Sequence, residues 1–536
     1  MARIVSIDPI YNWNSQKYGP YTVHSIGREK TVQEFLSLIP ESGPLDQKAL
    51  KRSLAGLKGN FAVIMEAPDF TLAVVDKVRG YPVFYIKRDK NFCVSNSARL
   101  LKREFDLAEV DELSLLEFRM AGYVTGRETL YKNLYQLQAG EFLVWDKLQA
   151  NLRRERYYIF YSNKVREEKK DDLIQELDGI TNAIVQRNME DAAGRPIWVP
   201  LSGGLDSRLI LCKLKQLGYD NLHAFSYGLP GNFEAKAAGH VAEKLEIPWI
   251  FVPSRKKPFK NFFWSEQRKR YWAFSDGLCS VPNMQDLKTL KDLRENAKLP
   301  ENAVLVNGQS GDFITGGHLP PVLSGEEAAW DQMTERLTAK HYSLWLDRKT
   351  PANLNRITEK VLKLVKEIEP DPESSKRKGL LYEYWEWQER QCKYVVNGQR
   401  TYDFFQLSWD LPLWQEEYLF FWESIPVPQK LGQELYRSYL SAFDFYGLFK
   451  NYAPNIWRWP GISIAVVPLA QLVGLVAGRR TKDLFYKYAS YFGHYGDYFG
   501  AYGFRNFLMR IKHARGAMSF LVDTWIKENM TATGRG

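Results

Sequence analysis

Residues 200–207 read Pro-Leu-Ser-Gly-Gly-Leu-Asp-Ser, and this octet constrains the fold more than any other stretch of the chain. It follows the apolar run 197–199 and precedes the apolar run 209–211, so a strand, a tight turn and a helix N-terminus are expected in that order. Gly203 and Gly204 let the backbone approach a ligand closely, and the first amides of a helix bind anions. The octet therefore predicts a polyphosphate site at the end of a strand.

The apolar pattern around the octet alternates between strand-like runs and helical periods. Strands are expected at 197–201, 222–226, 249–252 and 304–307, and helices at 207–217 and 234–245. Such alternation is typical of a parallel sheet that binds its ligand at the carboxyl ends of the strands. Before residue 160, short runs between turn residues predict an antiparallel β-rich region with strands at 61–66, 71–75, 82–86 and 141–145.

The octet resembles the pyrophosphate-binding loop of ATP pyrophosphatases, and its flanks resemble the asparagine synthetase family. The sequence Asn-Gly-Gln-Ser-Gly-Asp at 307–312, followed by Gly-Gly-His at 316–318, resembles that family's second loop. Residues 225–228 resemble its adenine-contacting strand end, and Gly-Asn-Phe-Ala at 59–62 resembles part of its N-terminal domain. The resemblance covers roughly residues 55–450. It implies an α/β parallel-sheet synthetase domain of the ATP-pyrophosphatase type, preceded by an α+β, β-rich glutaminase-like domain of the Ntn type.

The resemblance also implies a site for ATP and Mg²⁺. The residues expected to bind the nucleotide are Leu201, Ser202, Gly203, Gly204, Asp206, Ser207, Tyr227 and Gly308. Asp206 and Asp312 would share the Mg²⁺ that accompanies the phosphates. Catalytic roles are expected for Asp206, Gln309, Asp312 and a late lysine, for which Lys450 is the choice and Lys430 the competing candidate.

The implied reaction activates a carboxylate. Its oxygen attacks the α-phosphorus of ATP to give an acyl-adenylate and pyrophosphate, and a nitrogen nucleophile then displaces AMP to form an amide. Gln309 stands where asparagine synthetases have glutamate and β-lactam synthetases have tyrosine, and Phe313 replaces an acidic residue. An amide side chain orients a substrate by hydrogen bonding but cannot act as a general base. Aspartate is therefore not the expected substrate.

Residues 389–426, together with the second loop, resemble asparagine-synthase-related proteins of bacterial surface-polysaccharide pathways. That resemblance implies a sugar uronate as the carboxylate substrate. Arg390, Lys393 and Arg400 are spaced so that they could share one helical face and grip an anionic sugar. A solvated basic helix face is an equally open interpretation. Asp410 replaces the arginine of the family's R-x-P-F-L-D motif.

The first part of the chain lacks the features of a glutaminase. Ala2 stands where glutamine-using relatives have a catalytic cysteine, their glutamine-binding motifs have no counterpart, and only 58 residues precede Gly59. We therefore expect a glutaminase-like domain without activity, with nitrogen taken from free ammonia, a separate glutaminase or an amine on the substrate. Two alternatives stay open: an intramolecular cyclase of the β-lactam synthetase or lasso-peptide type, and a non-catalytic nucleotide-binding scaffold.

We predict three parts, at 1–160, 170–450 and 451–536, with a charged linker at 164–172. Four scattered cysteines indicate neither a disulfide framework nor a zinc site, and the chain's start lacks the apolar core of a signal peptide. These features favour a cytoplasmic enzyme. The net charge of +10 is concentrated after residue 450, where 11 Lys or Arg face 4 Asp or Glu, but no nucleic-acid-binding motif accompanies it.

The tail differs from the rest of the chain. Residues 461–478 are almost uncharged until Arg479 and Arg480, and residues 485–504 include ten aromatic side chains. One interpretation is a peripheral anchor at 461–515 on the inner membrane surface, using apolar, aromatic and basic residues together. The other, which the sequence slightly favours, is a helical hairpin packed on the synthetase domain, with tyrosines lining a sugar site.

Overall fold

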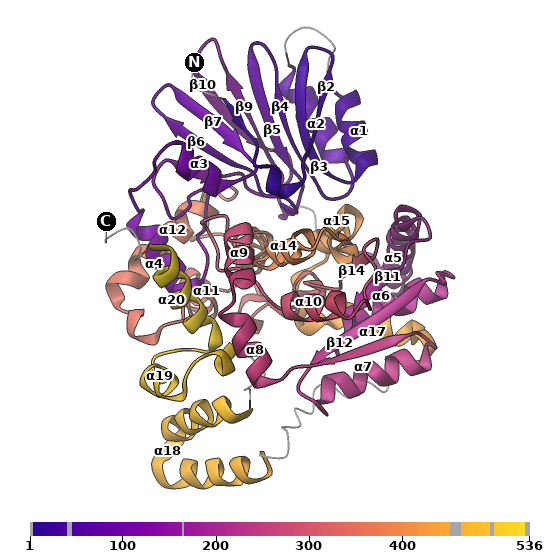
Figure 1. Ribbon diagram of the computed structural model, residues 1–536, viewed down its shortest axis with the longest axis vertical. Coiled ribbons are helices and arrows are strands. Elements are labelled where there is room, and N and C mark those ends of the chain that lie inside the picture. The colour runs from indigo at the N-terminus through magenta and orange to yellow at the C-terminus, as the bar shows by residue number, and fades with distance from the viewer. Residues whose placement is uncertain (1–3, 40–44, 163–165, 451–462, 494–497, 531–536) are drawn as a thin grey trace.

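The computed structural model describes residues 4–39, 45–162, 166–450, 463–493 and 498–530. Ala2, part of the expected linker and the start of the 461–478 run lie outside the described residues. Figure 1 shows β-sheets at one end of the long axis, an α/β region in the middle and helix α18 at the other end.

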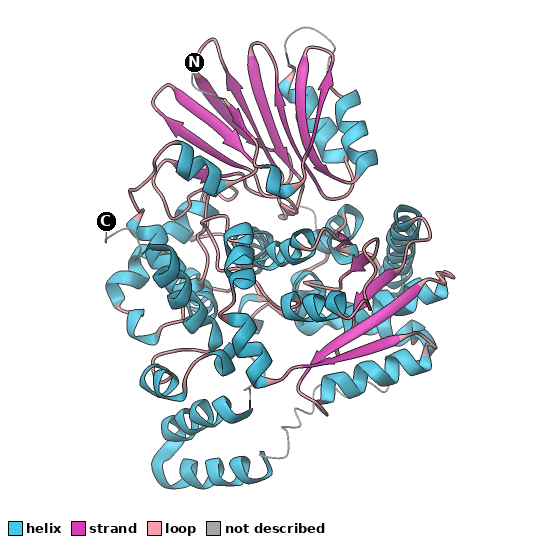
Figure 2. Ribbon diagram, in the orientation of Figure 1, coloured by secondary structure: helices cyan, strands magenta, loops and turns pink. Residues whose placement is uncertain are grey.

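The first 160 residues form two packed sheets, which are the strand-rich end of Figure 2. One is six-stranded and antiparallel, in the order β10 (Asn151–Arg156), β9 (Glu141–Asp146), β5 (Phe70–Val75), β4 (Phe61–Glu66), β3 (Tyr21–Gly27) and β2 (Asn14–Tyr18). The other has the order β1 (Val5–Ser6), β7 (Asn91–Ser95), β6 (Phe84–Arg88) and β8 (Leu134–Gln136). The expectation of a β-rich region is confirmed.

Strand β4 shows why these sheets pack. Successive side chains of a strand point to opposite faces. Ala62 and Ile64 join the core shared with the smaller sheet, while Val63 and Met65 face α1 (Glu29–Ser37) and α2 (Gln47–Gly56). Every one of these side chains is buried, because both faces of the six-stranded sheet are covered.

The α/β region is built on a five-stranded sheet in which every neighbouring pair is parallel. Its order is β13 (Trp249–Pro253), β12 (Leu222–Gly228), β11 (Ile197–Pro200), β14 (Val304–Val306) and β15 (Ser408–Asp410). The expected parallel sheet is confirmed, and β15 is an additional strand. The two faces of the five-stranded sheet have separate cores. In β11, Ile197 and Val199 pack on one side and Trp198 packs on the other.

Helices cover both faces of this sheet. On one side lie α5 (Lys170–Ala192), α6 (Leu205–Gln216) and α7 (Phe233–Lys244), and on the other lies α10 (Leu287–Glu295). Helix α5 begins inside the charged stretch expected as a linker. Asp171 and Asp172 occupy its first turn, where the helix dipole favours negative charge.

The remaining helices surround these two regions. They are α3 (Ala98–Glu104), α4 (Glu112–Ala121), α8 (Lys256–Phe263), α9 (Glu266–Ser275), α11 (Trp330–His341), α12 (Pro351–Val365), α13 (Lys378–Trp385), α14 (Arg400–Phe404), α15 (Glu416–Ser424), α16 (Val427–Lys430), α17 (Glu434–Phe443), α18 (Ser463–Gly493), α19 (Phe504–Arg510) and α20 (Ala517–Met530). Between α13 and α14 the chain forms a π-helical segment, Glu386–Val395, and one 3₁₀ turn.

Helix α20 is part of the hydrophobic core. Trp525 is fully buried, its ring lies 4.7 Å from that of Phe118, and its indole N–H donates to Asp276 at 3.0 Å. Arg268 in α9 forms a 2.6 Å ion pair with Glu528. This half of the tail therefore packs against the body of the protein. Over the residues that the structure describes, no helix is long and apolar enough to cross a membrane.

Candidate active site

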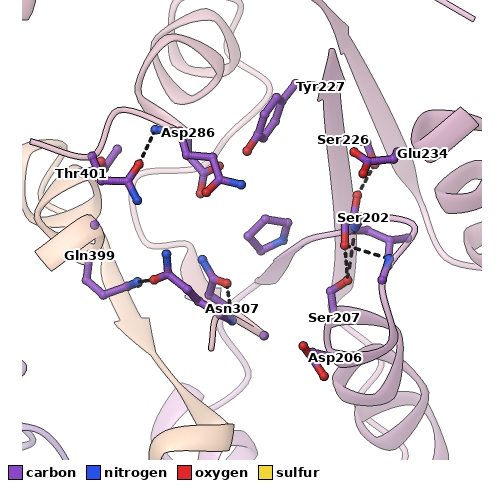
Figure 3. Close-up of a pocket in the computed structure, with 18 of the residues that line it drawn as sticks. Ser202, Asp206, Ser207, Ser226, Tyr227, Glu234, Asp286, Asn307, Gln399 and Thr401 are labelled. Carbon is purple, nitrogen blue, oxygen red and sulfur yellow. Dashed lines mark hydrogen bonds between the residues drawn. The ribbon is translucent and has the colours of Figure 1, made fainter. Parts of the chain in front are cut away.

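A pocket of about 240 Å³ opens at the carboxyl ends of β11, β12 and β14. In Figure 3, Ser202, Asp206 and Ser207 lie along one wall, and Asp286, Gln399 and Thr401 lie across from them. The carboxyl edge of a parallel sheet is the common ligand position in such folds. The structure therefore places the octet of residues 200–207 where the sequence expects a ligand.

The first loop joins β11 to α6 with few residues. The hydroxyl of Ser202 accepts the Gly204 N–H at 3.1 Å and lies 3.2 Å from the Ser207 hydroxyl, which also accepts the Ser202 N–H. Gly204 is the N-cap of α6 and has no side chain to cap it. The amides of the first helical turn are therefore aimed at the pocket edge, as an anion site requires.

The second loop touches the first so closely that only glycine fits. A Cβ on Gly308 would lie 2.6 Å from the Ser207 nitrogen, and a Cβ on Gly311 would lie 2.5 Å from Asp206 Cγ. Real Cβ atoms do not approach other atoms at these distances. The Gly-x-x-Gly spacing at 308–311 is thus explained by contact between loops about a hundred residues apart.

Two carboxylates meet at this contact. Burial and the nearby charge of Asp312 raise the pKa of Asp206 to about 7, although the Tyr436 hydroxyl donates to it at 2.9 Å. Burial raises the pKa of Asp312, but the hydrogen bond and charge of His318, the Phe313 N–H and the charge of Arg390 together outweigh it and lower that pKa. Of the two carboxylates, Asp206 therefore takes up a proton at the higher pH.

These carboxylates fit a nucleotide-borne Mg²⁺ ion. Magnesium keeps several waters and is held through one or two carboxylates together with substrate phosphates. No group of three or more His, Cys, Asp or Glu side chains arranged for a metal occurs in the described part of the chain. A site of two carboxylates, Asp206 and Asp312, therefore suits a cation that arrives with phosphate better than a resident one.

The opposite wall is a hydrogen-bonded polar network. Asp286 accepts from the hydroxyls of Tyr402, at 2.6 Å, and Tyr227, while the Tyr402 hydroxyl accepts from Asn307 at 2.9 Å. Burial raises the pKa of Asp286. Sequence reasoning missed Asp286, because an aspartate before a helix looks like an ordinary N-cap.

Gln309 lies in the pocket, held by its neighbours. The Gln399 side chain donates to its carbonyl oxygen Oε1 at 2.5 Å, and the backbone carbonyl of Gln309 accepts the Trp414 indole N–H at 3.1 Å. The pairing with Gln399, invisible in the sequence, fixes the orientation of the amide.

A charged network adjoins Asp312 outside the pocket lining. His318 contacts Asp312 at 3.1 Å through Nε2 and Glu386 at 2.5 Å through Nδ1. The fully buried Glu386 is also 3.0 Å from Lys340. Burial opposes protonation of His318, but these two acidic partners raise its pKa above the ordinary value. The two carboxylates thus favour the protonated form of the histidine in the expected Gly-Gly-His motif.

The expected nucleotide residues are distributed as follows. Leu201, Ser202, Gly204, Asp206, Ser207, Tyr227 and Gly308 line the pocket. Gly203 is buried, and its backbone carbonyl accepts a hydrogen bond from Arg208. Asp312 is outside the pocket lining, but its charge acts on Asp206, which is part of it.

Neither late lysine lies in the pocket lining. Lys430 is fully buried and pairs with Glu383 at 2.5 Å, and its backbone lies against Gly316. Lys450 is exposed, and its backbone N–H donates to Asp444 at 2.9 Å. The structure thus brings Lys430, not Lys450, to the base of the second loop.

The structure corrects the prediction that Arg390, Lys393 and Arg400 share one face of an α-helix. Lys393 is buried and pairs with Glu389 at 2.5 Å, and the buried Arg400 pairs with Asp403 at 2.9 Å. Arg390 is partly exposed and lies 3.5 Å from Glu386. The α-helical spacing does not apply to Arg390 and Lys393, because both lie in the π-helical segment Glu386–Val395. A solvated basic face is therefore wrong for Lys393 and Arg400, and both have acidic partners.

Fold and site together define an α/β protein with a glycine-rich loop and a second, acidic loop at the carboxyl edge of a parallel sheet. Residues 176–448 match the family model described as asparagine synthase. The chain belongs to the asparagine synthase family.

Parts of the chain are similar to known proteins. A protein assigned as glutamine-hydrolyzing asparagine synthetase 2 of Methanocaldococcus jannaschii is 22% identical over 249 residues, which are 46% of each chain. The chain thus spans about half the length of this curated relative. A glutamine PRPP amidotransferase from B. subtilis is 15% identical, with 55% of this chain and 63% of that chain covered and a TM-score of 0.18. A structure titled as the allosteric regulatory enzyme of purine biosynthesis is 13% identical, with 54% and 55% covered and the same TM-score. Scores this low carry no argument.

Proposed function

We propose that this protein is an ATP-dependent ligase that activates a carboxylate as its adenylate and converts it to an amide. The observation that carries the proposal is the contact between the two loops, which joins an anion-binding helix terminus to Asp206 and Asp312 at the mouth of the pocket. Family membership supports the same chemistry.

In the first step, a carboxylate oxygen of the substrate attacks the α-phosphorus, and the bond to the bridging oxygen breaks so that pyrophosphate leaves with the electron pair. In the second, ammonia attacks the acyl carbon, AMP leaves, and the nitrogen loses a proton. The amides of the first loop stabilise the phosphates. Asp206 and Asp312 would hold Mg²⁺, which when bound neutralises charge on the leaving pyrophosphate.

The acceptor in this proposal is a sugar uronate. The pocket wall opposite the first loop offers neutral hydrogen-bonding groups, among them Gln309, Gln399, Asn283 and Thr401, and such groups suit hydroxyls. Gln309 would orient the carboxylate or the ammonia, since its amide is already fixed by Gln399.

We also propose that the two-sheet region is a glutaminase-like domain of the Ntn type without glutaminase activity, and that the chain divides near residues 160 and 450. All four cysteines are buried, and burial raises the pKa of Cys212 to about 12. A glutaminase thiol must be accessible and ionise readily, so the buried cysteines support ammonia, free or delivered by a separate protein, as the nitrogen source.

The test is incubation with ATP, Mg²⁺, ¹⁵N-ammonium and a panel of uronate-containing nucleotide sugars, followed by mass spectrometry. The proposal expects an amide carrying one ¹⁵N. A dehydrated product without ¹⁵N would instead assign ring closure within one substrate. No product from any carboxylate, with ATP bound, would favour a nucleotide-binding scaffold.

A further inference from the structure

Helix α18 is a hairpin of two helical arms at the end of the molecule farthest from the N-terminal sheets (Figure 1). The arms meet at Gly478, whose φ of 80° and ψ of 170° are not helical. A Cβ on Gly474 in the first arm would lie 2.9 Å from Lys482 Cδ in the second, and Lys482 donates to Gln471 at 2.9 Å. The arms therefore pack on each other through a small residue.

The first arm buries the small side chain of Ala470 and exposes several large apolar ones. Ala470 is fully buried, whereas Leu469, Leu472, Leu475 and Val476 are between 50% and 85% exposed. Positions 469, 472 and 476 follow the three- and four-residue spacing of one helix face. This is the reverse of a helix that packs on a protein core, since the apolar face is the one left in contact with water.

Helix α19 contacts the second arm of α18 and also exposes apolar side chains. Tyr491 of the second arm lies 5.0 Å, centroid to centroid, from Phe504 of α19, and Phe504, Leu508 and Met509 are exposed. Seven of the thirteen large hydrophobic side chains exposed in the described residues lie between 469 and 509. Several large apolar side chains exposed on neighbouring helices are typical of an interaction site.

Cations border the same surface. Residues 463–516 contain eight Lys or Arg against two Asp or Glu. Arg479 and Arg480 are exposed at the hairpin corner, and Arg505 is exposed on α19. Helix α8 adds exposed lysines, one of which, Lys256, lies 4.7 Å over the Tyr491 ring.

We propose that α18 and α19 form a docking surface for an anionic lipid bilayer, with the apolar face inserted at the headgroup level and the cations on the anionic lipids. Amphipathic helices of this composition bind membranes in the interface plane without crossing them. A second copy of this chain is a poorer occupant, because it would set one strongly cationic surface against another. The inference does not depend on the proposed reaction.

The experiment is sedimentation of the full chain with vesicles of phosphatidylcholine alone or with about one third phosphatidylglycerol, at low and at physiological salt. We expect binding only to the anionic vesicles, weakening as salt rises because exposed charges are screened over about 8 Å at physiological ionic strength. The variant Leu472→Asp/Leu475→Asp is expected to bind at least tenfold more weakly, as is Arg479→Glu/Arg480→Glu.

The matched control is Leu148→Asp, which makes the same change at a leucine that is 86% exposed near the opposite end of the molecule. It is expected to bind vesicles like the wild type. Unchanged circular dichroism and melting temperature of each variant exclude unfolding as the cause. Equal binding of wild type and Leu472→Asp/Leu475→Asp, or no binding to anionic vesicles at low salt, would overturn the inference. A dimer seen by light scattering that this variant abolishes, without vesicle binding, would assign the surface to a second copy instead.

Discussion

The backbone of Gly311 rests on the carboxylate of Asp206, since a Cβ at Gly311 would lie 2.5 Å from Asp206 Cγ. One loop follows β11 and the other follows β14, which are neighbouring parallel strands. The two acidic residues of the site are thus positioned by strand pairing and glycine contact.

Gly311→Ala is therefore expected to displace the second loop and weaken ATP binding at least tenfold, measured by calorimetry. The added methyl would lie 2.5 Å from both Asp206 Cγ and Leu413 Cδ1, so the Asp206 carboxylate must shift from its position in the site. Gly325→Ala is the control, because no atom lies within 4 Å of its Cβ position. Equal affinity in the two variants would contradict the close contact.

The pH dependence of Mg-ATP binding follows from Asp206. Its pKa of about 7 means that it is protonated below neutrality and must lose a proton to face Mg²⁺. At saturating Mg²⁺ we expect affinity to fall up to tenfold per pH unit below about 7 and to level off above it. Asp206→Asn is expected to lose that slope, and an unchanged slope in this variant would assign the titration to another group.

The raised pKa of Asp206 also predicts how the free energy of unfolding depends on pH. A carboxyl whose folded pKa is raised destabilises the fold above that pKa, and the penalty vanishes below its unfolded pKa near 4. Asp206→Asn is thus expected to stabilise the nucleotide-free protein at pH 8 by about 1 kcal/mol or more, since one pKa unit is worth about 1.4 kcal/mol and solvent screens part of it. The gain is expected to disappear near pH 4. Denaturant unfolding at both pH values measures this, and a loss of stability at pH 8 would contradict it.

The buried pair of Lys430 and Glu383 predicts a structural role for that lysine. Lys430→Met leaves Glu383 buried without its partner and is expected to cost about 3–5 kcal/mol of unfolding free energy. Lys430→Met/Glu383→Gln is expected to recover most of it, together with ATP binding. Lys450→Met is expected to leave both stability and ATP binding unchanged, because its side chain is exposed outside the pocket. A double variant that is stable but inactive would give Lys430 a role in catalysis.

The sequence predicted the elements that local pattern controls. The strand at 61–66 and the helix after the octet appear at or within two residues of their expected bounds, because apolar periodicity and glycine turns act locally. The charged stretch before α5 was harder to interpret, since acidic residues can be linker or helix N-terminus.

The site was only partly predictable. The loops could be found because glycine and aspartate are needed at fixed spacing, whereas Asp286 and Gln399 could not, because their role depends on contacts with Tyr402 and Gln309 from distant parts of the chain. For Lys393 and Arg400 the sequence predicted a role that their contacts do not support. Their charge could be read from the sequence, but the acidic partner of each and the π-helical geometry around Lys393 could not.

The position at which ATP is cleaved tests the central claim most directly. Phosphorus NMR of a reaction with carboxylate substrate and ammonium is predicted to show AMP and pyrophosphate formed in equal amounts with the amide, and Asp206→Ala is predicted to form none of them. Formation of ADP and inorganic phosphate, or full activity in Asp206→Ala, would contradict adenylation at this site.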